Sequence, residues 1–144
     1  MHSRRKREEE DNCIAFADWC RWNAHMIPAL RQLIHIPNGG ERPSFTNQDG
    51  ERVSPEGARL KRMGVQAGVY DYLLAVPSFI EGVPKCGLWI EFKTKDGRES
   101  EEQRQFAARQ EQFNYATVLV RSWTDGVYEV LKYLGREGYS GRPQ

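Results

Sequence analysis

The sequence predicts an α/β fold in which a central mixed β-sheet is flanked by helices. Three apolar runs of strand length, residues 72–76, 88–92 and 116–120, alternate along the chain with segments of helical pattern. The chain has 144 residues, the usual length of one domain with one core. We therefore expect residues 1–144 to form a single domain, with residues 1–7 and 138–144 flexible.

Composition narrows the class of protein. Charged residues make up 28% of the chain and hydrophobic residues 39%, which predicts a soluble protein. The net charge of +1 does not indicate a nucleic-acid partner, so any basic surface has to come from local arrangement. Three cysteines without a C-x-x-C pair argue against a disulfide framework and favour a reducing cytoplasm. No apolar run approaches the roughly 18 residues of a membrane span, and the N-terminus lacks signal character.

The N-terminal part of the chain begins with a helix. Residues 4–10 change from basic to acidic, which suits a first helical turn, and an apolar pattern continues to about Asn23. A short strand is expected at residues 33–36, closed by the turn residues 37–40. Residues 41–54 are polar and turn-rich and predict a long surface loop.

The second helix is marked at both ends. Ser54 suits the N-cap, Pro55 the first helical position, and Gly64 stands just past the end. Basic side chains of this helix and the preceding loop either line a phosphate groove or form a solvated face. They are Arg42, Arg52, Arg59, Lys61 and Arg62. His35, in the first strand, could also touch DNA, although partial burial is the simpler interpretation.

Three charged residues stand at the ends of the two central strands. Asp71 precedes the run 72–76, and Glu91 and Lys93 lie at the end of the next strand, where they share one face while Phe92 points to the other. The link between the strands contains two prolines and a glycine and predicts a hairpin-like connection of antiparallel neighbours, which brings Asp71 beside Glu91. Such a site suits Mg²⁺ or Mn²⁺; the alternative is a surface salt bridge.

The C-terminal part predicts a helix, a strand and a helix. Ser100-Glu101-Glu102-Gln103 has the form of a capping box and starts a helix that reaches about Asn114. Residues 116–120 are continuously apolar, as in a strand covered on both faces. From about Asp125, apolar residues at helical spacing predict a last helix that ends at Gly135.

Three motifs in this order resemble the VRR-NUC family of PD-(D/E)XK nucleases. They are Gly68-Val69-Tyr70-Asp71, Gly87-Leu88-Trp89-Ile90-Glu91-Phe92-Lys93 and Ser100-Glu101-Glu102-Gln103. Residues 37–40 and the acidic first helix are similar as well. The likeness covers nearly the whole chain, whose length is that of the standalone phage or bacterial members. Val69-Tyr70 and Asn114-Tyr115 depart from the family pattern, and neither departure touches the metal-binding residues.

The resemblance implies a restriction-endonuclease-like fold and a metal-dependent DNA endonuclease that hydrolyses phosphodiester bonds. Asp71, Glu91 and the backbone carbonyl of Phe92 would hold Mg²⁺ or Mn²⁺, with Lys93 beside the attacking water or the scissile phosphate. Gln103 would hydrogen-bond that water or Lys93, in addition to or instead of capping its helix. A carboxylate of the first helix would complete the site or support a second metal. Glu9 is the expected residue, and Glu8 and Glu10 are the alternatives.

The expected substrate is branched DNA. No base-reading motif is visible, so DNA shape, as in flaps or Holliday junctions, should direct cleavage. The family's standalone members and the frequency of two-fold assemblies predict a homodimer in the cytoplasm of a bacterium or a phage-infected host. Two other classes stay open: a DNA-binding module that recruits without cleaving, and a metal-dependent hydrolase of small nucleotides. Loss of a residue of the Asp71, Glu91 and Lys93 triplet would mark the first, and none is lost.

Overall fold

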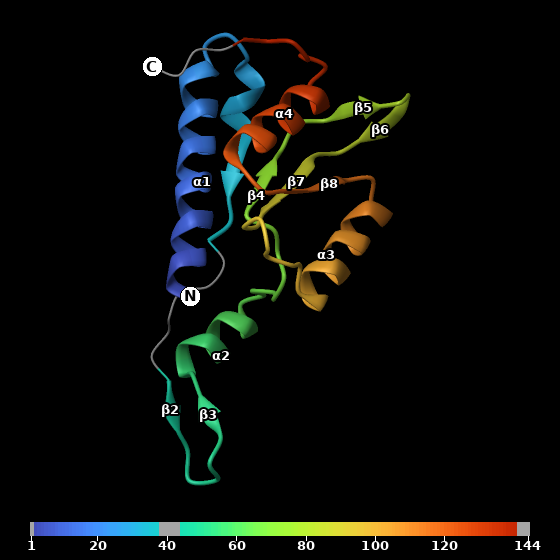
Figure 1. Cartoon of the computed structure of the whole chain (residues 1–144). Coiled ribbons are helices and arrows are strands. Elements are labelled where there is room, and N and C mark those ends of the chain that lie inside the picture. The colour runs from blue at the N-terminus through green and yellow to red at the C-terminus, as the bar shows by residue number, and fades with distance from the viewer. Residues whose placement is uncertain (1, 38–43, 141–144) are drawn as a thin grey trace.

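The computed structural model describes residues 2–37 and 44–140, with helices on both faces of a four-stranded sheet (Figure 1). In order across the sheet, the strands are β1 (Leu33–His35), β4 (Tyr72–Leu74), β7 (Leu88–Phe92) and β8 (Ala116–Val120). β1 and β7 run antiparallel to β4, whereas β8 runs parallel to β7. The predicted α/β class with a mixed central sheet is therefore confirmed.

One face of the sheet is covered by two helices, α1 (His2–Asn23) and α4 (Trp123–Tyr133). The buried ring of Phe16 on α1 lies with its centroid 5.4 Å from that of Tyr72 and 5.3 Å from that of Phe92. Gly126 of α4 packs so closely that a Cβ atom there would lie 2.9 Å from Phe16 and 3.0 Å from Phe92. The first helix, the last helix and the two central strands thus share one tightly packed layer.

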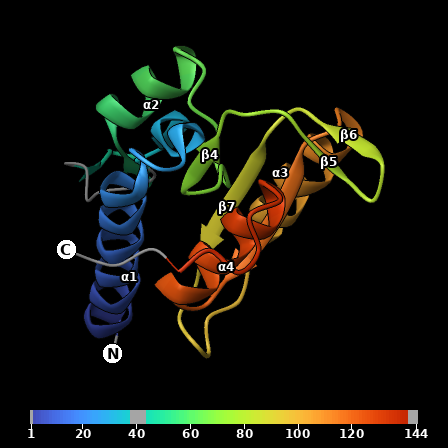
Figure 2. The same cartoon turned by 90° about the horizontal axis from the view of Figure 1, so that it is seen from above.

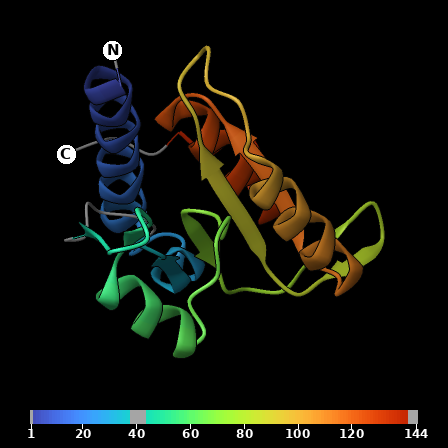
Figure 3. The ribbon, with the colours of Figure 1, turned by 90° about the horizontal axis from the view of Figure 1, so that it is seen from below.

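The opposite face is covered by α3 (Glu101–Gln112), and Figures 2 and 3 show α3 and α4 on opposite sides of β7. Trp89 points from β7 toward α3, where its ring centroid lies 4.9 Å from that of Phe106 and its Nε1 donates to Gln110 at 3.0 Å. Side chains alternate along a strand, so Glu91 shares this face with Trp89 while Phe92 lies on the other. The alternation predicted for this strand is confirmed.

An arm projects beyond the end of the sheet (Figure 1). It consists of β2 (Phe45–Thr46), β3 (Arg52–Val53) and α2 (Pro55–Arg62). The expectation of a loop throughout residues 41–54 is wrong where Phe45 pairs with Val53 and Thr46 with Arg52. Two-residue strands are too short to leave an alternating pattern in the sequence. The N-cap of α2 is as predicted, because Ser54 Oγ accepts from the Gly57 N–H at 3.1 Å.

The connection between β4 and β7 is a hairpin, as expected, formed by β5 (Ser78–Ile80) and β6 (Val83–Lys85). A short 3₁₀ helix, η1 (Pro28–Gln32), links α1 to β1. Within the described residues, no helix has the length and apolar character that crossing a bilayer requires.

Regular structure or side-chain contacts are present near both ends of the described residues. Residues 2–7 continue α1. Near the other end, the ring centroid of Tyr139 lies 6.3 Å from that of Trp19, and its hydroxyl donates to Asn23 Oδ1 at 3.1 Å. Flexibility of residues 1–7 and 138–144 stays a prediction, and these contacts argue against it at residue 139.

Candidate active site

The antiparallel register of β4 and β7 brings two carboxylates together. Tyr72 pairs with Ile90, so Asp71 and Glu91 stand side by side at the end of the pair. The Asp71 N–H donates to Glu91 Oε2 at 3.1 Å, and the Phe92 N–H donates to Asp71 Oδ2 at 2.8 Å. Each carboxylate therefore accepts a hydrogen bond from a backbone N–H of the other strand.

Lys93 and Gln103 both meet Glu91 at one oxygen. Lys93 Nζ lies 3.3 Å from Glu91 Oε1, and Gln103 Nε2 donates to the same atom at 2.6 Å. The other end of the Gln103 amide accepts from the Ser100 N–H at 2.9 Å, which closes the expected capping box. Gln103 therefore combines a capping role with a contact in the site. That contact is to Glu91, whereas the sequence pointed to Lys93 or a water.

Burial sets the electrostatics of the site. The Glu91 side chain is buried, and this burial, followed by the charge on Asp71, raises the pKa of Glu91 to about 8. Burial also raises the pKa of Asp71, an effect partly offset by the Phe92 N–H and by Lys93. Two carboxylates share one ammonium group here, so the ionised pair carries excess negative charge that a bound cation would neutralise.

The donor set fits a hard divalent cation. Within residues 2–37 and 44–140, no three Cys, His, Asp or Glu side chains converge into a metal site. Zinc is normally held by three or four protein ligands, so it is a poor match. Mg²⁺ keeps several waters and takes one or two carboxylates plus substrate phosphate, which is what Asp71 and Glu91 offer. The residues present therefore fit Mg²⁺ or Mn²⁺.

Glu9 reaches the site from α1. Its Oε1 accepts from the Thr94 N–H at 3.3 Å, one residue beyond Lys93. It also lines a cleft of about 670 Å³ together with Asp71 and Tyr72. Glu10 lines the same cleft, whereas Glu8 lines a separate hollow beside Lys95. Among the three glutamates, Glu9 is the one that hydrogen-bonds the segment that follows β7.

His35 lies next to Asp71 at the edge of the same cleft. Its Nδ1 is 2.9 Å from the Asp71 carbonyl oxygen, which also accepts from the Ile36 N–H at 2.8 Å. The His35 ring centroid lies 4.8 Å from that of Tyr72, and the residue is exposed, not partly buried. The side chain therefore steadies the backbone of Asp71 while one edge of the ring faces the solvent.

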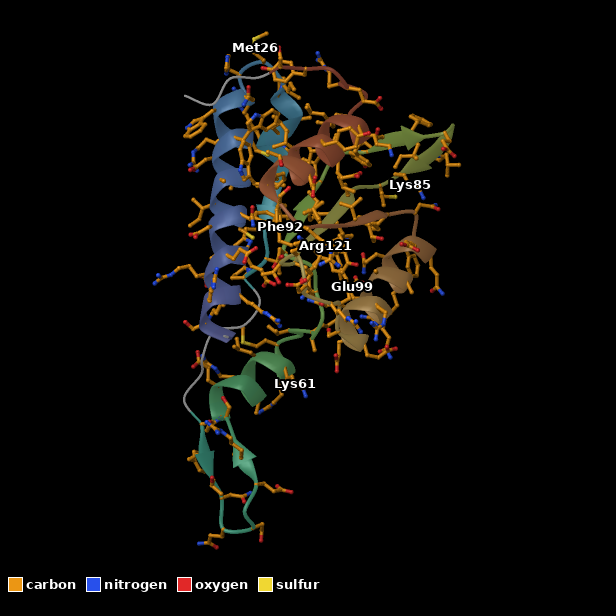
Figure 4. The ribbon with its side chains drawn as sticks, viewed as in Figure 1. Met26, Lys61, Lys85, Phe92, Glu99 and Arg121 are labelled. Carbon is orange, nitrogen blue, oxygen red and sulfur yellow. The ribbon has the colours of Figure 1, made fainter. Side chains whose placement is uncertain are left out.

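A second cleft, of about 700 Å³, runs between the arm and the start of α3. Arg52 and Lys61 line it on the arm side, and Gln103 lines it on the α3 side. Arg59 and Arg62 are exposed on α2. Figure 4 shows Lys61 on α2, between the β2–β3 hairpin and Glu99 in that view. Arg42, the remaining predicted cation, lies outside the described residues.

Two residues without an assigned role in the sequence position the site. Gly68 has a φ of +82°, and a Cβ there would overlap the Glu102 carbonyl and lie 2.7 Å from the Gln103 nitrogen. Arg121 Nη1 donates to the carbonyls of Thr94, Lys95 and Gly97 at 2.6, 3.2 and 2.7 Å. Gly68 is visible as a motif glycine, whereas nothing around Arg121 in the sequence signals a loop contact.

The fold matches that of a solved structure described as a VRR_NUC domain protein. The TM-score is 0.65 and the identity 18%, over 94% of this chain and 95% of that one. At this identity the likeness concerns the fold, and the predicted restriction-endonuclease-like architecture is confirmed. No protein-family model and no curated protein matches the sequence.

Proposed function

We propose that this chain is a metal-dependent nuclease of the VRR-NUC type that hydrolyses DNA phosphodiester bonds. The observation that carries the proposal is the cluster of Asp71, Glu91 and Lys93 on the ends of β4 and β7. It occurs in a fold shared with a VRR_NUC domain protein. The resemblance of the three sequence motifs supports the same assignment.

Asp71, Glu91 and the backbone carbonyl of Phe92 would hold Mg²⁺ or Mn²⁺. When bound, such an ion lowers the pKa of a coordinated water and neutralises charge on the phosphate. Lys93 places an ammonium group beside the carboxylates, where it can donate to a phosphate oxygen or to the attacking water. Gln103 keeps Glu91 in one orientation through its 2.6 Å hydrogen bond. Preorganised donors and ligands of this kind reduce the rearrangement needed at the transition state.

Glu9 is proposed as a further ligand or as support for a second ion. One of its oxygens already accepts from the Thr94 N–H, which leaves the second oxygen to serve this role. The neighbouring glutamates are poorer choices, because neither forms a hydrogen bond to the segment after β7 among the described residues.

The arm supplies the proposed path for DNA. Arg52 and Lys61 line a cleft that ends at Gln103, so a strand lying in it would meet cations before it reached the carboxylates. The other proposed contacts are Arg42, Arg59, Arg62 and His35. The arm projects well beyond the sheet, so it could contact a DNA branch away from the cut. We therefore propose selectivity for flaps or junctions, read from shape and not from base sequence.

The test is cleavage of labelled duplex, flap and four-way DNA with Mg²⁺, Mn²⁺ or EDTA. We expect cutting with either metal, none in EDTA, and preference for the branched substrates. Lys93→Ala should abolish cutting, while Lys132→Ala, an exposed lysine of α4, should leave it unchanged. Cutting that persists in EDTA would overturn the proposal. Tight binding without cutting would favour the recruitment module, and cleavage of free nucleotides alone would favour the small-nucleotide hydrolase.

We also propose a cytoplasmic homodimer. Two copies related by a two-fold axis would present two active sites to a symmetric junction. Light scattering coupled to gel filtration should give twice the chain mass at the concentration used for cleavage. A monomer mass under those conditions would remove the dimer from the account without affecting the assignment of the active site.

A further inference from the structure

We propose that a basic pocket between α1 and the loop after β7 binds the DNA backbone phosphate next to the one that is cut. The pocket has a volume of about 390 Å³. Arg5 and Lys6 line it from α1, and Lys93 and Arg98 line it from the loop. The inference rests on the proposed nuclease function and adds a second anchoring point for the substrate. Apart from Lys93, none of the cations expected from the sequence to contact DNA belongs to it.

The charges in this pocket are unbalanced. Four cationic side chains line it against one carboxylate, that of Glu9. Glu9 accepts a hydrogen bond from the Thr94 N–H, and Lys93 is already paired with Glu91. Among the described residues, no acidic partner is within ion-pair distance of the remaining cations, Arg5, Lys6 and Arg98. Like charges gathered in a hollow repel one another, so a bound anion would stabilise the arrangement.

The wall of the pocket is fixed in advance. Thr94 is buried in this wall, and its Oγ1 lacks a hydrogen-bond partner within the part of the chain that the structure describes. Arg121 ties the loop down through three backbone carbonyls, and the Gly97 N–H donates to the Thr94 carbonyl at 3.0 Å. Figures 2 and 3 show this loop lying toward the N-terminal end of α1. A loop held in this way loses little conformational entropy when it binds a ligand.

The position of the pocket identifies the phosphate. Lys93 lines it and also contacts Glu91, so an anion held here lies next to the group that faces the carboxylates. The cleft along the arm shares no lining residue with this pocket and meets the site at Gln103. In Figure 2, α2 and the loop after β7 lie at opposite ends of the molecule. A strand would therefore pass from the arm, across the carboxylates, to this pocket.

The chemistry favours a phosphate diester. Guanidinium groups present paired donors that match phosphate oxygens, and Arg5 and Arg98 come from two different elements. An internal backbone phosphate, a terminal phosphate and free inorganic phosphate all share this chemistry. The proposal commits to the internal one, because the pocket adjoins the position at which a continuous strand would be cut.

The test measures DNA binding in EDTA, where the proposed cleavage cannot occur, so binding is observed separately from cutting. Fluorescence anisotropy of a labelled flap substrate over a salt series compares wild type with Arg5→Gln/Arg98→Gln. The matched control is Lys132→Gln/Arg136→Gln, which removes the same charge from exposed positions at the end of α4. We expect the first variant to bind several-fold more weakly and its salt slope to fall by about one for each phosphate that it no longer neutralises. The control should follow wild type.

Single methylphosphonate linkages then locate the bound phosphate. One internal neutral linkage should weaken binding by wild type and have no further effect in the double variant. Arg98→Gln alone should lose about half of the binding that the double variant loses. Because Arg98 lies in an exposed loop, this variant leaves α1 unchanged and shows that the loss does not come from a disturbed helix. Three results would overturn the proposed pocket. They are equal weakening of binding at every neutral linkage, weakening that occurs solely with a terminal phosphate, and a double variant that binds DNA as tightly as wild type. If the neutral linkage weakens binding by wild type and not by the double variant, but wild type never cuts DNA, the nuclease proposal fails and the pocket stands as a binding site for an internal phosphate.

Discussion

The Gln103 side chain joins the start of α3 to the active site. Its Nε2 donates to Glu91 Oε1 at 2.6 Å, while its Oε1 accepts from the Ser100 N–H at 2.9 Å. A helix cap and the orientation of a proposed metal ligand therefore depend on one amide. We therefore expect a change that moves the first turn of α3 to disturb Glu91 as well.

The first prediction separates these two roles of Gln103. Gln103→Ala removes the donor to Glu91, and we expect Mn²⁺ affinity and cleavage to fall roughly 10- to 100-fold, as when outer partners of metal ligands are removed. Ser100→Ala removes the capping oxygen but keeps the amide, so it should cost about 1 kcal/mol of unfolding free energy with cleavage nearly intact. Calorimetric Mn²⁺ titration and thermal melting measure both effects. An equal fall in cleavage in the two variants would contradict the separation.

The second prediction concerns the close approach of Gly68 to α3. Gly68→Ala puts a methyl group into the Glu102 carbonyl, in addition to the strain of a φ of +82°. Gly50→Ala is the matched control, because Gly50 has a φ of +81° and a methyl group there would meet no heavy atom within 4 Å. The control should lose about 1–2 kcal/mol of stability from backbone strain. Gly68→Ala should lose about 1–3 kcal/mol more, from overpacking, and should cleave more slowly.

Denaturant unfolding of these two variants checks that prediction. The informative quantity is the difference in unfolding free energy between them, since the strain at positive φ is common to both. If the two variants were equally stable and Gly68→Ala cut DNA at the wild-type rate, the close approach of Gly68 to α3 would have no functional consequence.

The third prediction follows from the raised pKa of Glu91. Burial and the charge on Asp71 raise the pKa of Glu91 from 4.5 to about 8, so between these values the folded protein holds a proton that the unfolded chain releases. Without metal, stability contributed by this group should be complete below pH 4.5 and should be lost as the pH rises through 8. Glu91→Gln should flatten this dependence. Thermal melting from about pH 5 to about pH 9 in EDTA provides the comparison.

Bound Mg²⁺ should offset the loss of stability that occurs as the pH rises. Binding requires ionised carboxylates, so the rise in melting temperature caused by Mg²⁺ should be larger at about pH 8.5 than at about pH 6. Glu91→Gln should show a small rise at both values. A metal-induced rise that is independent of pH in wild type would be inconsistent with ligation by Glu91.

The sequence predicted the strands that carry the site because their signals are local. A continuous apolar run identifies β7, and strand alternation places Glu91 and Lys93 on one face. The hairpin-like link predicts antiparallel pairing, from which the meeting of Asp71 and Glu91 follows. Ser100 and Gln103 show their capping box at a spacing of three residues. Each of these features follows from a pattern, a turn signal or a short spacing that the sequence displays.

The features that the sequence could not predict leave no readable pattern in it, because they depend on how side chains pack or on strands too short to alternate. The bond from Gln103 to Glu91 requires the packing of α3 on the sheet, and no periodicity encodes it. Arg121 lies 24 to 27 residues from the carbonyls that it binds. The pairing of β2 with β3 involves two residues in each strand, which is too few for an alternating pattern. The basic pocket joins Arg5 to Arg98, a proximity that only the folded chain creates.

The fourth prediction tests the role of Arg121 in holding the loop after β7. Arg121→Ala removes the donor to three backbone carbonyls, so amide exchange in residues 94–98 should accelerate by about tenfold while β7 itself stays protected. Cleavage should fall, because Lys93 begins this loop. Arg136→Ala, an exposed arginine beyond α4, is the control. Unchanged exchange across residues 94–98 would show that other interactions hold the loop.

The central claim is that Asp71 and Glu91 hold the ion that supports DNA cleavage. Its most direct test is the initial rate at which Asp71→Asn/Glu91→Gln cuts a labelled flap substrate in Mn²⁺, beside wild type. Both substitutions conserve shape, and the relief of repulsion between buried carboxylates offsets the acceptor that Glu91→Gln takes from one of its donors, so the variant should fold about as stably as wild type. We predict that its cutting falls below detection while its melting temperature is maintained. Cutting at the wild-type rate would contradict the account.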